Sequence, residues 1–403
     1  MGVQANLDQI FEKALTQGKT IYKNKEALEL KWTPPRLIGR DRELEALGQH
    51  VSRMIDTQRN ISILGTIGCG KTVCVKYVLP RFEKKAQAFG KKVKTIYISC
   101  HDVPSTSDIL AYILNRLKKP DERKIPNRGW YQAMYVEKLE SYAERFDAVI
   151  ICLDEVDIPV ERGYDGVIRT IVETPNTSLV TISNKPNWYE KLDPRIESRL
   201  QLRELHFDSY DVPALYSILE DRARIAFKDG IIKFPPGGGQ HEGLFNIAKI
   251  CYDVAGDARS AIELLRASGE LLEQGYDTDI TPKLIEKARK EVEVAGFVKQ
   301  IGGLALHQKF LLYAICELAK LAKPTSGKMY VPLSKALQLY KSIAAKKGKE
   351  ILTDRRLRTY LDQFEMYGFI ERKTISEGGR KGRPTYIKPL FDVKKCLEAL
   401  EES

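Results

Sequence analysis

Residues 61–72 read ISILGTIGCGKT, a short apolar run followed directly by a glycine-rich loop. The spacing G-x-x-x-x-G-K-T is that of a phosphate-binding loop, in which glycines let backbone N–H groups turn inward around phosphate oxygens. Lys71 is expected to reach the β- and γ-phosphates of ATP, or the β-phosphate of ADP, and the hydroxyl of Thr72 to bind Mg²⁺ at the start of the next helix. The other residues of the cradle are Gly65, Gly68, Cys69 and Gly70. An ordinary glycine turn is the alternative, and the flanking strand and helix patterns disfavour it.

Composition places the chain among soluble proteins of two or three domains. It has 403 residues, 43% of them hydrophobic and 30% charged. The longest apolar run, residues 148–153, is too short for a membrane span and is typical of a buried strand. No signal-peptide pattern is visible in residues 1–8, and the seven cysteines show no zinc spacing. We therefore expect reduced thiols, a cytoplasmic protein associated with the nucleoid, and no membrane partner.

Positive charge is concentrated at the C-terminal end. Residues 301–403 carry 20 Lys and Arg against 11 Asp and Glu, a net charge of +9, whereas the rest of the chain carries only +2 of the total of +11. This asymmetry is typical of a nucleotide-dependent module joined to a nucleic-acid-binding module. A solvated basic face without a partner is the alternative.

The order of patterns predicts three folded parts. Strands and helices alternate after residue 35, which indicates an α/β domain with a parallel sheet, and the pattern turns helical at about residue 211. The strands are expected at residues 61–64, 93–99, 148–153 and 178–183. The expected domains are an N-terminal extension (1–35), a nucleotide-binding base (36–208), a helical lid (209–297) and a basic C-terminal domain (298–403).

Polar side chains at the ends of two predicted strands complete a phosphoryl-transfer site. Asp154 and Glu155 follow the apolar run, where Asp154 would help hold Mg²⁺ and Glu155 would position or deprotonate an attacking water. Asn184 follows the next strand, close to the expected γ-phosphate. An acidic turn and an ordinary strand-ending turn are the alternatives for these two positions.

This order of features resembles the AAA+ ATPases, and more narrowly their initiator clade. The segment LDPRIESRL at 192–200 is similar to the family segment whose arginine reaches the nucleotide of a neighbouring subunit. The resemblance implies that Arg199 is this arginine, with Arg195 as the rival and a surface ion pair as the alternative. A guanidinium suits the task because it is always charged.

The lid region carries a second part of the resemblance. The segment GDARSAI at 256–262 is similar to the family's lid motif, which implies that Arg259 contacts the γ-phosphate in cis. Residues 210–227 resemble the first lid helix of the family. By that resemblance Tyr210 and Arg222 lie near the nucleotide.

The basic C-terminal domain has a winged-helix pattern. Thr353 can cap a helix in which Leu357, Leu361 and Phe364 fall on one face. Four residues lie off that face, as in a helix presented to the major groove of DNA: Arg355, Arg356, Arg358 and Thr359. Two predicted strands then flank a hairpin tip suited to the minor groove, with the candidate contacts Gly379, Arg380, Lys381 and Arg383. A structural hairpin with a solubilising tip is the alternative.

The resemblance over residues 20–400 is to the archaeal origin-recognition initiators, relatives of the largest subunit of the eukaryotic origin recognition complex and of its helicase-loading partner. An extra predicted helix at 108–119 lies where initiators carry an insertion that approaches DNA. The resemblance implies a P-loop AAA+ domain, an all-helical lid and a C-terminal winged helix. It also implies a weak, Mg²⁺-dependent ATPase that binds double-stranded origin DNA, distorts it, and works with other initiator subunits and the replicative helicase.

Two other classes of ATPase also join these domains. A branch-migration motor would form a stable ring with fast DNA-stimulated hydrolysis, and a signalling or transcriptional ATPase would bind promoters. The extra helix and the lid motif disfavour the motor, and the extra helix also disfavours the signalling or transcriptional ATPase. A non-enzymatic scaffold is disfavoured because the phosphate loop, Asp154, Glu155 and Asn184 occur together.

Overall fold

The computed structural model describes residues 20–401 except Pro104, Ala255, 322–329, Tyr367 and 375–384. The chain divides into two compact units, Met1–Ala288 and Arg289–Ser403. None of the described helices is long and apolar enough to cross a membrane.

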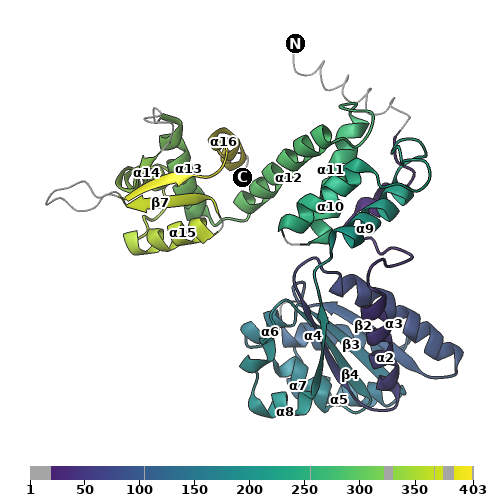
Figure 1. Cartoon of the computed structure of the whole chain (residues 1–403). Coiled ribbons are helices and arrows are strands. Elements are labelled where there is room, and N and C mark those ends of the chain that lie inside the picture. The colour runs from purple at the N-terminus through teal and green to yellow at the C-terminus, as the bar shows by residue number, and fades with distance from the viewer. Residues whose placement is uncertain are drawn as a thin grey trace. The chain divides into compact units, whose positions relative to one another are not determined.

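The first unit is built on a parallel five-stranded sheet with the strand order β2-β3-β4-β1-β5. Figure 1 labels three of its strands, β2, β3 and β4. Its strands are β1 (Asn60–Gly65), β2 (Val93–Ser99), β3 (Ala148–Asp154), β4 (Thr177–Ser183) and β5 (Leu202–Phe207). The connecting helices are α2 (Asp41–Ser52), η2 (Arg53–Ile55), α3 (Lys71–Ala88), α4 (Thr106–Leu117), α5 (Gln132–Ala143), α6 (Asp157–Glu161), α7 (Gly166–Glu173), η3 (Trp188–Lys191) and α8 (Pro194–Leu200).

Helices cover both faces of this sheet, which explains the continuous apolar run of β3. Val149, Ile151 and Leu153 pack in a core with α4, α5, α7 and α8. Ile150 and Cys152 point to the opposite core, which contains residues of α2 and α3. Because successive side chains of a strand point to opposite faces, a strand buried on both faces must be apolar at every position.

Three helices above the carboxyl end of the sheet form the lid: α9 (Val212–Ala226), α10 (Glu242–Val254) and α11 (Ala258–Glu273). The described part of the predicted N-terminal extension packs on them. Its short helix η1 (Lys25–Leu28) contacts α9 and α11. The ring of Tyr22 lies 5.0 Å from that of Phe227 at the end of α9. The segment therefore belongs to the helical layer before it continues toward α2.

Helix α12 (Pro282–Gly302) leads to the second unit, which has the winged-helix order of elements. Its helices are α13 (Leu306–Leu321), α14 (Leu333–Lys346), α15 (Asp354–Met366) and α16 (Val393–Glu401). Strands β6 (Val331–Pro332), β8 (Thr385–Pro389) and β7 (Ile370–Thr374) form an antiparallel sheet in the order β6-β8-β7. Leu311, Tyr340, Leu357, Leu361 and Phe364 are fully buried in its core.

Candidate functional site

The phosphate loop links β1 to α3 in a conformation that requires glycine. Gly68 and Gly70 have φ angles of 77° and 92°, in the left-handed region that L side chains rarely adopt. A Cβ at Gly70 would lie 2.5 Å from the hydroxyl of Tyr210, and one at Gly65 would overlap the carbonyl oxygen of Phe207. Backbone atoms can therefore line the loop without side chains in the way.

Lys71 begins α3 and is 6% exposed. Its ammonium group donates to the carbonyl oxygens of Gly65 (2.8 Å) and Thr66 (2.6 Å) and to Oδ1 of Asn184 (2.9 Å). Burial lowers the pKa of Lys71 from its ordinary value. The predicted lysine and the predicted polar residue after β4 are thus brought together, with Cys69 buried beneath them.

Two oxygen groups meet where a metal ion is expected. The hydroxyl of Thr72 donates to Oδ2 of Asp154 at 2.7 Å, and the hydroxyl of Tyr97 donates to the same oxygen at 2.6 Å. Burial and the bond to Asp154 raise the pKa of Tyr97 well above its ordinary value, so it remains a donor. Among the described residues, no cluster of three or more His, Cys, Asp or Glu could hold a metal alone. One carboxylate and one hydroxyl fit Mg²⁺ that takes its other ligands from phosphate and water.

Glu155 follows the strand in a strained conformation. Its φ is 57°, and its backbone N–H donates to Oδ1 of Asp154 at 3.0 Å. A non-glycine residue held in the left-handed region is a feature of functional turns. The turn places the Glu155 side chain in the lining of the same cavity as Asn184.

The lid reaches the phosphate loop through the start of α11. The backbone N–H of Ala258 donates to the carbonyl oxygen of Gly68 at 3.3 Å. Asp257 caps α11, and a Cβ at Gly68 would fall on its carboxylate oxygen. Arg259 is the next residue of α11 and lines the cavity beside the loop.

Arg222 lines the cavity, and its side chain contacts the N-terminal segment. Its guanidinium donates to the carbonyl oxygen of Ala27 at 2.6 Å and lies 4.4 Å from the ring centre of Trp32. Burial lowers the pKa of Arg222 to about 10. These contacts hold the N-terminal segment against α9, and the proximity of Arg222 to a nucleotide stays a prediction.

Arg40 and Tyr97 were not singled out from the sequence. Arg40 is 4% exposed, donates to the carbonyl oxygen of Asp208 at 2.6 Å, pairs with Glu43, and lies 3.8 Å from the ring centre of Tyr210. Its position just before α2 looked like an ordinary helix start. A buried charge beside the loop could only have been recognised from the distant residues that pack around it.

The site is a cavity of about 430 Å³, which is in the range of small-molecule pockets. The sequence-predicted residues that line it are Gly68, Gly70, Lys71, Thr72, Asp154, Glu155, Asn184, Tyr210, Arg222 and Arg259. Gly65 and Cys69 belong to the same loop but do not line the cavity. The N-terminal segment closes another side of the cavity with residues 30–34 and 36–38.

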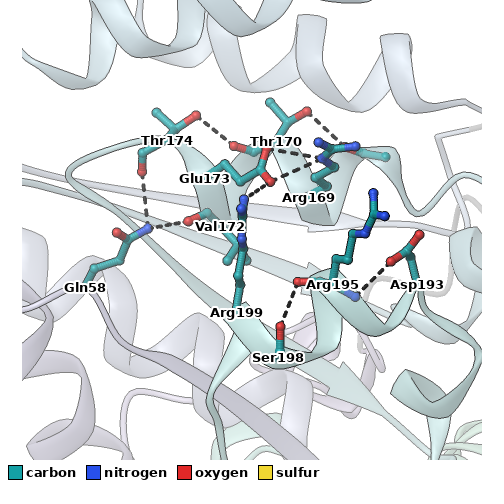
Figure 2. Close-up of polar contacts among 11 residues, drawn as sticks. Gln58, Arg169, Thr170, Val172, Glu173, Thr174, Asp193, Arg195, Ser198 and Arg199 are labelled. Atoms are coloured by element: carbon teal, nitrogen blue, oxygen red, sulfur yellow. Dashed lines mark hydrogen bonds and ion pairs between the residues drawn. The ribbon is translucent and has the colours of Figure 1, made fainter.

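Arg199 and Arg195 lie outside this cavity, on α8 (Figure 2). Arg199 lines a different cavity with Asn60 and Arg203, at the amino ends of β1 and β5. The six residues of β1 put about 17 Å between this edge and the phosphate loop. Arg199 therefore cannot contact the nucleotide of its own chain through this geometry. It forms an ion pair with Glu173.

The second unit presents the predicted basic helix. Arg355, Arg356, Arg358 and Thr359 are exposed on α15, whereas the opposite face of the helix is buried. Arg372 of β7 binds Glu365 of α15 with two donors (2.9 and 2.5 Å), which ties the strand to the helix. The predicted hairpin tip, with Gly379, Arg380, Lys381 and Arg383, lies outside the described residues.

A phosphate loop on β1, acidic and polar residues at the ends of β3 and β4, a helical lid and a separate winged helix define a P-loop AAA+ ATPase. Family models match the three parts in order: AAA domain at 53–183, Cdc6 AAA+ ATPase-type lid domain at 216–290, and CDC6 C-terminal winged helix domain at 299–399. The chain belongs to the Cdc6/ORC1-type family of replication initiators.

Individual relatives cover nearly the whole chain. An ORC1-type DNA replication protein of Pyrococcus abyssi is 34% identical over 399 residues, 96% of this chain and 91% of that protein. ORC1-type DNA replication protein 1 of Archaeoglobus fulgidus is 31% identical over 403 residues, 98% of this chain and 93% of that protein. The structure of the Aeropyrum pernix ORC1 protein in complex with DNA has a TM-score of 0.78, with 27% identity over 96% of this chain and 98% of that one. This assignment favours the initiator class over the branch-migration motor and the transcriptional or signalling ATPase.

Proposed function

We propose that this chain is an ATP-controlled replication initiator that binds origin DNA. The observation that carries the proposal is the cavity shared by the phosphate loop and the start of α11, on a chain whose other unit exposes a basic helix. A ligand held by both the base and the lid fixes the angle between them. ATP and ADP then act as a conformational switch, because only ATP offers a γ-phosphate to Arg259.

Different residues of the cavity bind different parts of the nucleotide. Lys71 holds the β- and γ-phosphates, and Thr72 with Asp154 holds Mg²⁺. The bound Mg²⁺ supplies charge neutralisation on the phosphates. Glu155 orients the attacking water and takes its proton, and Asn184 fixes the position of that water. The N-terminal segment excludes bulk solvent from one side.

ATP hydrolysis by a single copy is slow, because the arginine that completes the site comes from a second copy. Arg199 lies at the opposite edge of the sheet and serves a second initiator subunit. A guanidinium supplied in trans is worth about 10³–10⁵ in rate in other phosphoryl-transfer enzymes. The turnover number of the wild-type protein should rise with protein concentration. Arg199→Ala should abolish this rise, while nucleotide binding stays unchanged.

DNA binding uses both positive charge and base contacts. Arg355, Arg356, Arg358 and Thr359 of α15 face the major groove, and the hairpin residues Gly379, Arg380, Lys381 and Arg383 face the minor groove. Basic residues that follow α4 contact the phosphate backbone of the duplex: Lys118, Lys119, Arg123, Lys124 and Arg128. Binding at two places bends or underwinds the duplex, and the bound protein recruits the replicative helicase. Phosphate contacts make the affinity fall steeply with salt.

Titration of origin fragments and random duplex at two salt concentrations tests this function. Arg355→Ala/Arg358→Ala should lose origin preference, with about 1–3 kcal/mol lost for each base contact. The matched control, Lys394→Ala/Lys395→Ala, removes the same charge from α16 and should keep the preference. Equal binding of both duplexes by the wild-type protein, with fast DNA-stimulated hydrolysis, would contradict the initiator function.

A further inference from the structure

A second cavity, of about 800 Å³, lies at the amino ends of β1 and β5. Its lining contains a single carboxylate, that of Glu173. Its basic lining residues are His50, Arg59, Arg199 and Arg203. Three guanidinium groups around one carboxylate are the chemistry of an anion site, because guanidinium donors match phosphate and carboxylate geometry.

The positive charge of this cavity is largely uncompensated. The side chain of Arg59 donates to the hydroxyl of Thr57 at 2.7 Å. Within the part of the chain that the structure describes, neither Arg59 nor Arg203 forms an ion pair. Burial, together with the nearby cations Arg203, Arg53 and Arg59, lowers the pKa of His50. The lowered pKa disfavours a charged His50, so the charge available to an anion comes mainly from the arginines.

Glu173 is placed where it binds the candidate trans-acting arginine (Figure 2). It is the last residue of α7, and its carboxylate pairs with Arg199. The side-chain amide of Gln58 donates to the carbonyl oxygens of Val172 (2.9 Å) and Thr174 (3.2 Å), which fixes this end of the helix. The carboxylate of Glu173 thus occupies the position on the Arg199 guanidinium that an incoming phosphate would take.

The ion pair between Arg199 and Glu173 is weak enough for another anion to replace Glu173. The side chains of Arg199 and Glu173 are 61% and 34% exposed, and such ion pairs contribute little in water. Arg169 on the same helix donates to both carboxylate oxygens of Glu173 at 3.2 Å. Glu173 therefore keeps a cationic partner when Arg199 leaves, so the exchange leaves no carboxylate without an ion pair. A phosphate group offers Arg199 two oxygens and more negative charge than a carboxylate.

We propose that Glu173 restrains Arg199 until the terminal phosphates of a nucleotide held by a second copy of this chain displace it. Arg59 and Arg203 add to the attraction for the phosphates. The inference rests on the proposed function, because it assumes that Arg199 acts in trans. It adds a residue that sets the protein concentration at which two copies cooperate.

A mixing experiment tests the role of Glu173. The receiver, Arg199→Ala, keeps its own phosphate loop but offers no arginine. The donor, Lys71→Ala, offers the arginine but does not support its own turnover. ATP hydrolysis by the receiver is measured while the donor is titrated. Donor carrying Glu173→Gln should reach half-maximal stimulation at about two- to fivefold lower concentration, the range of an exposed ion pair. Donor carrying Arg59→Gln and Arg203→Gln should require a higher concentration than the plain donor.

The control donor carries Glu220→Gln, which breaks the exposed Arg224–Glu220 pair of α9 and should behave like the plain donor. Thermal unfolding of every donor checks that each variant is folded. If no folded donor stimulates a receiver that still binds ATP, the trans function of Arg199 fails. If the plain donor stimulates and the Glu173→Gln donor is equal or weaker, the restraint by Glu173 is overturned while the trans function stands.

Discussion

Oδ2 of Asp154 accepts a 2.6 Å hydrogen bond from the hydroxyl of Tyr97. The two residues lie on neighbouring strands. Asp154 is the last residue of β3, and Tyr97 lies two residues before the end of β2, where it pairs with Cys152. The contact fixes the rotamer of a carboxylate that we assign to Mg²⁺. Partners that orient a metal ligand typically change metal affinity or activity about 10–100-fold when removed.

We therefore expect Tyr97→Phe to raise the Mg²⁺ concentration needed for half-maximal ATP hydrolysis about tenfold, near the lower end of that range. Titration of Mg²⁺ at saturating ATP measures this shift. Tyr112→Phe is the control, because the Tyr112 hydroxyl bonds to Arg116 on an exposed part of α4. An unchanged Mg²⁺ dependence in Tyr97→Phe would show that Asp154 needs no such support.

Arg40→Ala should destabilise the first unit by about 3 kcal/mol, since breaking a buried ion pair leaves the partner charge uncompensated. The substitution removes the pair with Glu43, the bond to the Asp208 carbonyl and the stacking on Tyr210. Arg40→Lys should recover only part of the loss, because an ammonium cannot make the two directed bonds and the stacking together. Urea unfolding of both variants measures the difference. Full recovery by lysine would mean that charge alone matters.

The nucleotide site could be largely predicted from the sequence because its chemistry is local. The phosphate loop is one continuous segment. Asp154 ends β3 and Asn184 directly follows β4, and the carboxyl ends of these parallel strands must share one edge of the sheet. Tyr210 and Arg259 required the family resemblance, since their approach to the loop depends on how the lid folds back. Their functional roles remain predictions.

The features that sequence patterns missed depend on distant partners. Strand β5 was not predicted, because at the sheet edge it exposes Arg203, Glu204 and His206 and buries only Phe207, so it shows little apolar alternation. In the sequence, Tyr97 looks like a core residue of β2. Its hydrogen bond to Asp154 forms only because β2 pairs with β3. Glu173 looks like any charge at a helix end until α8 brings Arg199 beside it.

Gly68→Ala should weaken ATP binding strongly, for two separable reasons. The φ of 77° strains any L residue, and the new Cβ would fall on the carboxylate of Asp257. Asp257→Ala alone should cost about 1 kcal/mol of lid stability as a lost helix cap. The double variant should bind ATP more tightly than Gly68→Ala, because the collision is relieved while the strain remains. Calorimetric titration of the four proteins gives the coupling, and strict additivity would show that the lid does not contact the loop through Asp257.

Alkaline pH should destabilise the fold through Cys74. Burial raises the pKa of the Cys74 thiol to about 12, from an ordinary value of 9.0. The stabilisation is fully present below pH 9 and is lost as the pH rises toward 12, because the unfolded thiol ionises first. Cys74→Ala should therefore lose about 1 kcal/mol less stability than the wild type between pH 9 and pH 10. Val75→Ala, a buried neighbour on α3, controls for the lost volume and should keep the wild-type slope. Denaturant unfolding across this pH range measures both, and parallel slopes for wild type and Cys74→Ala would assign the alkaline loss to other groups.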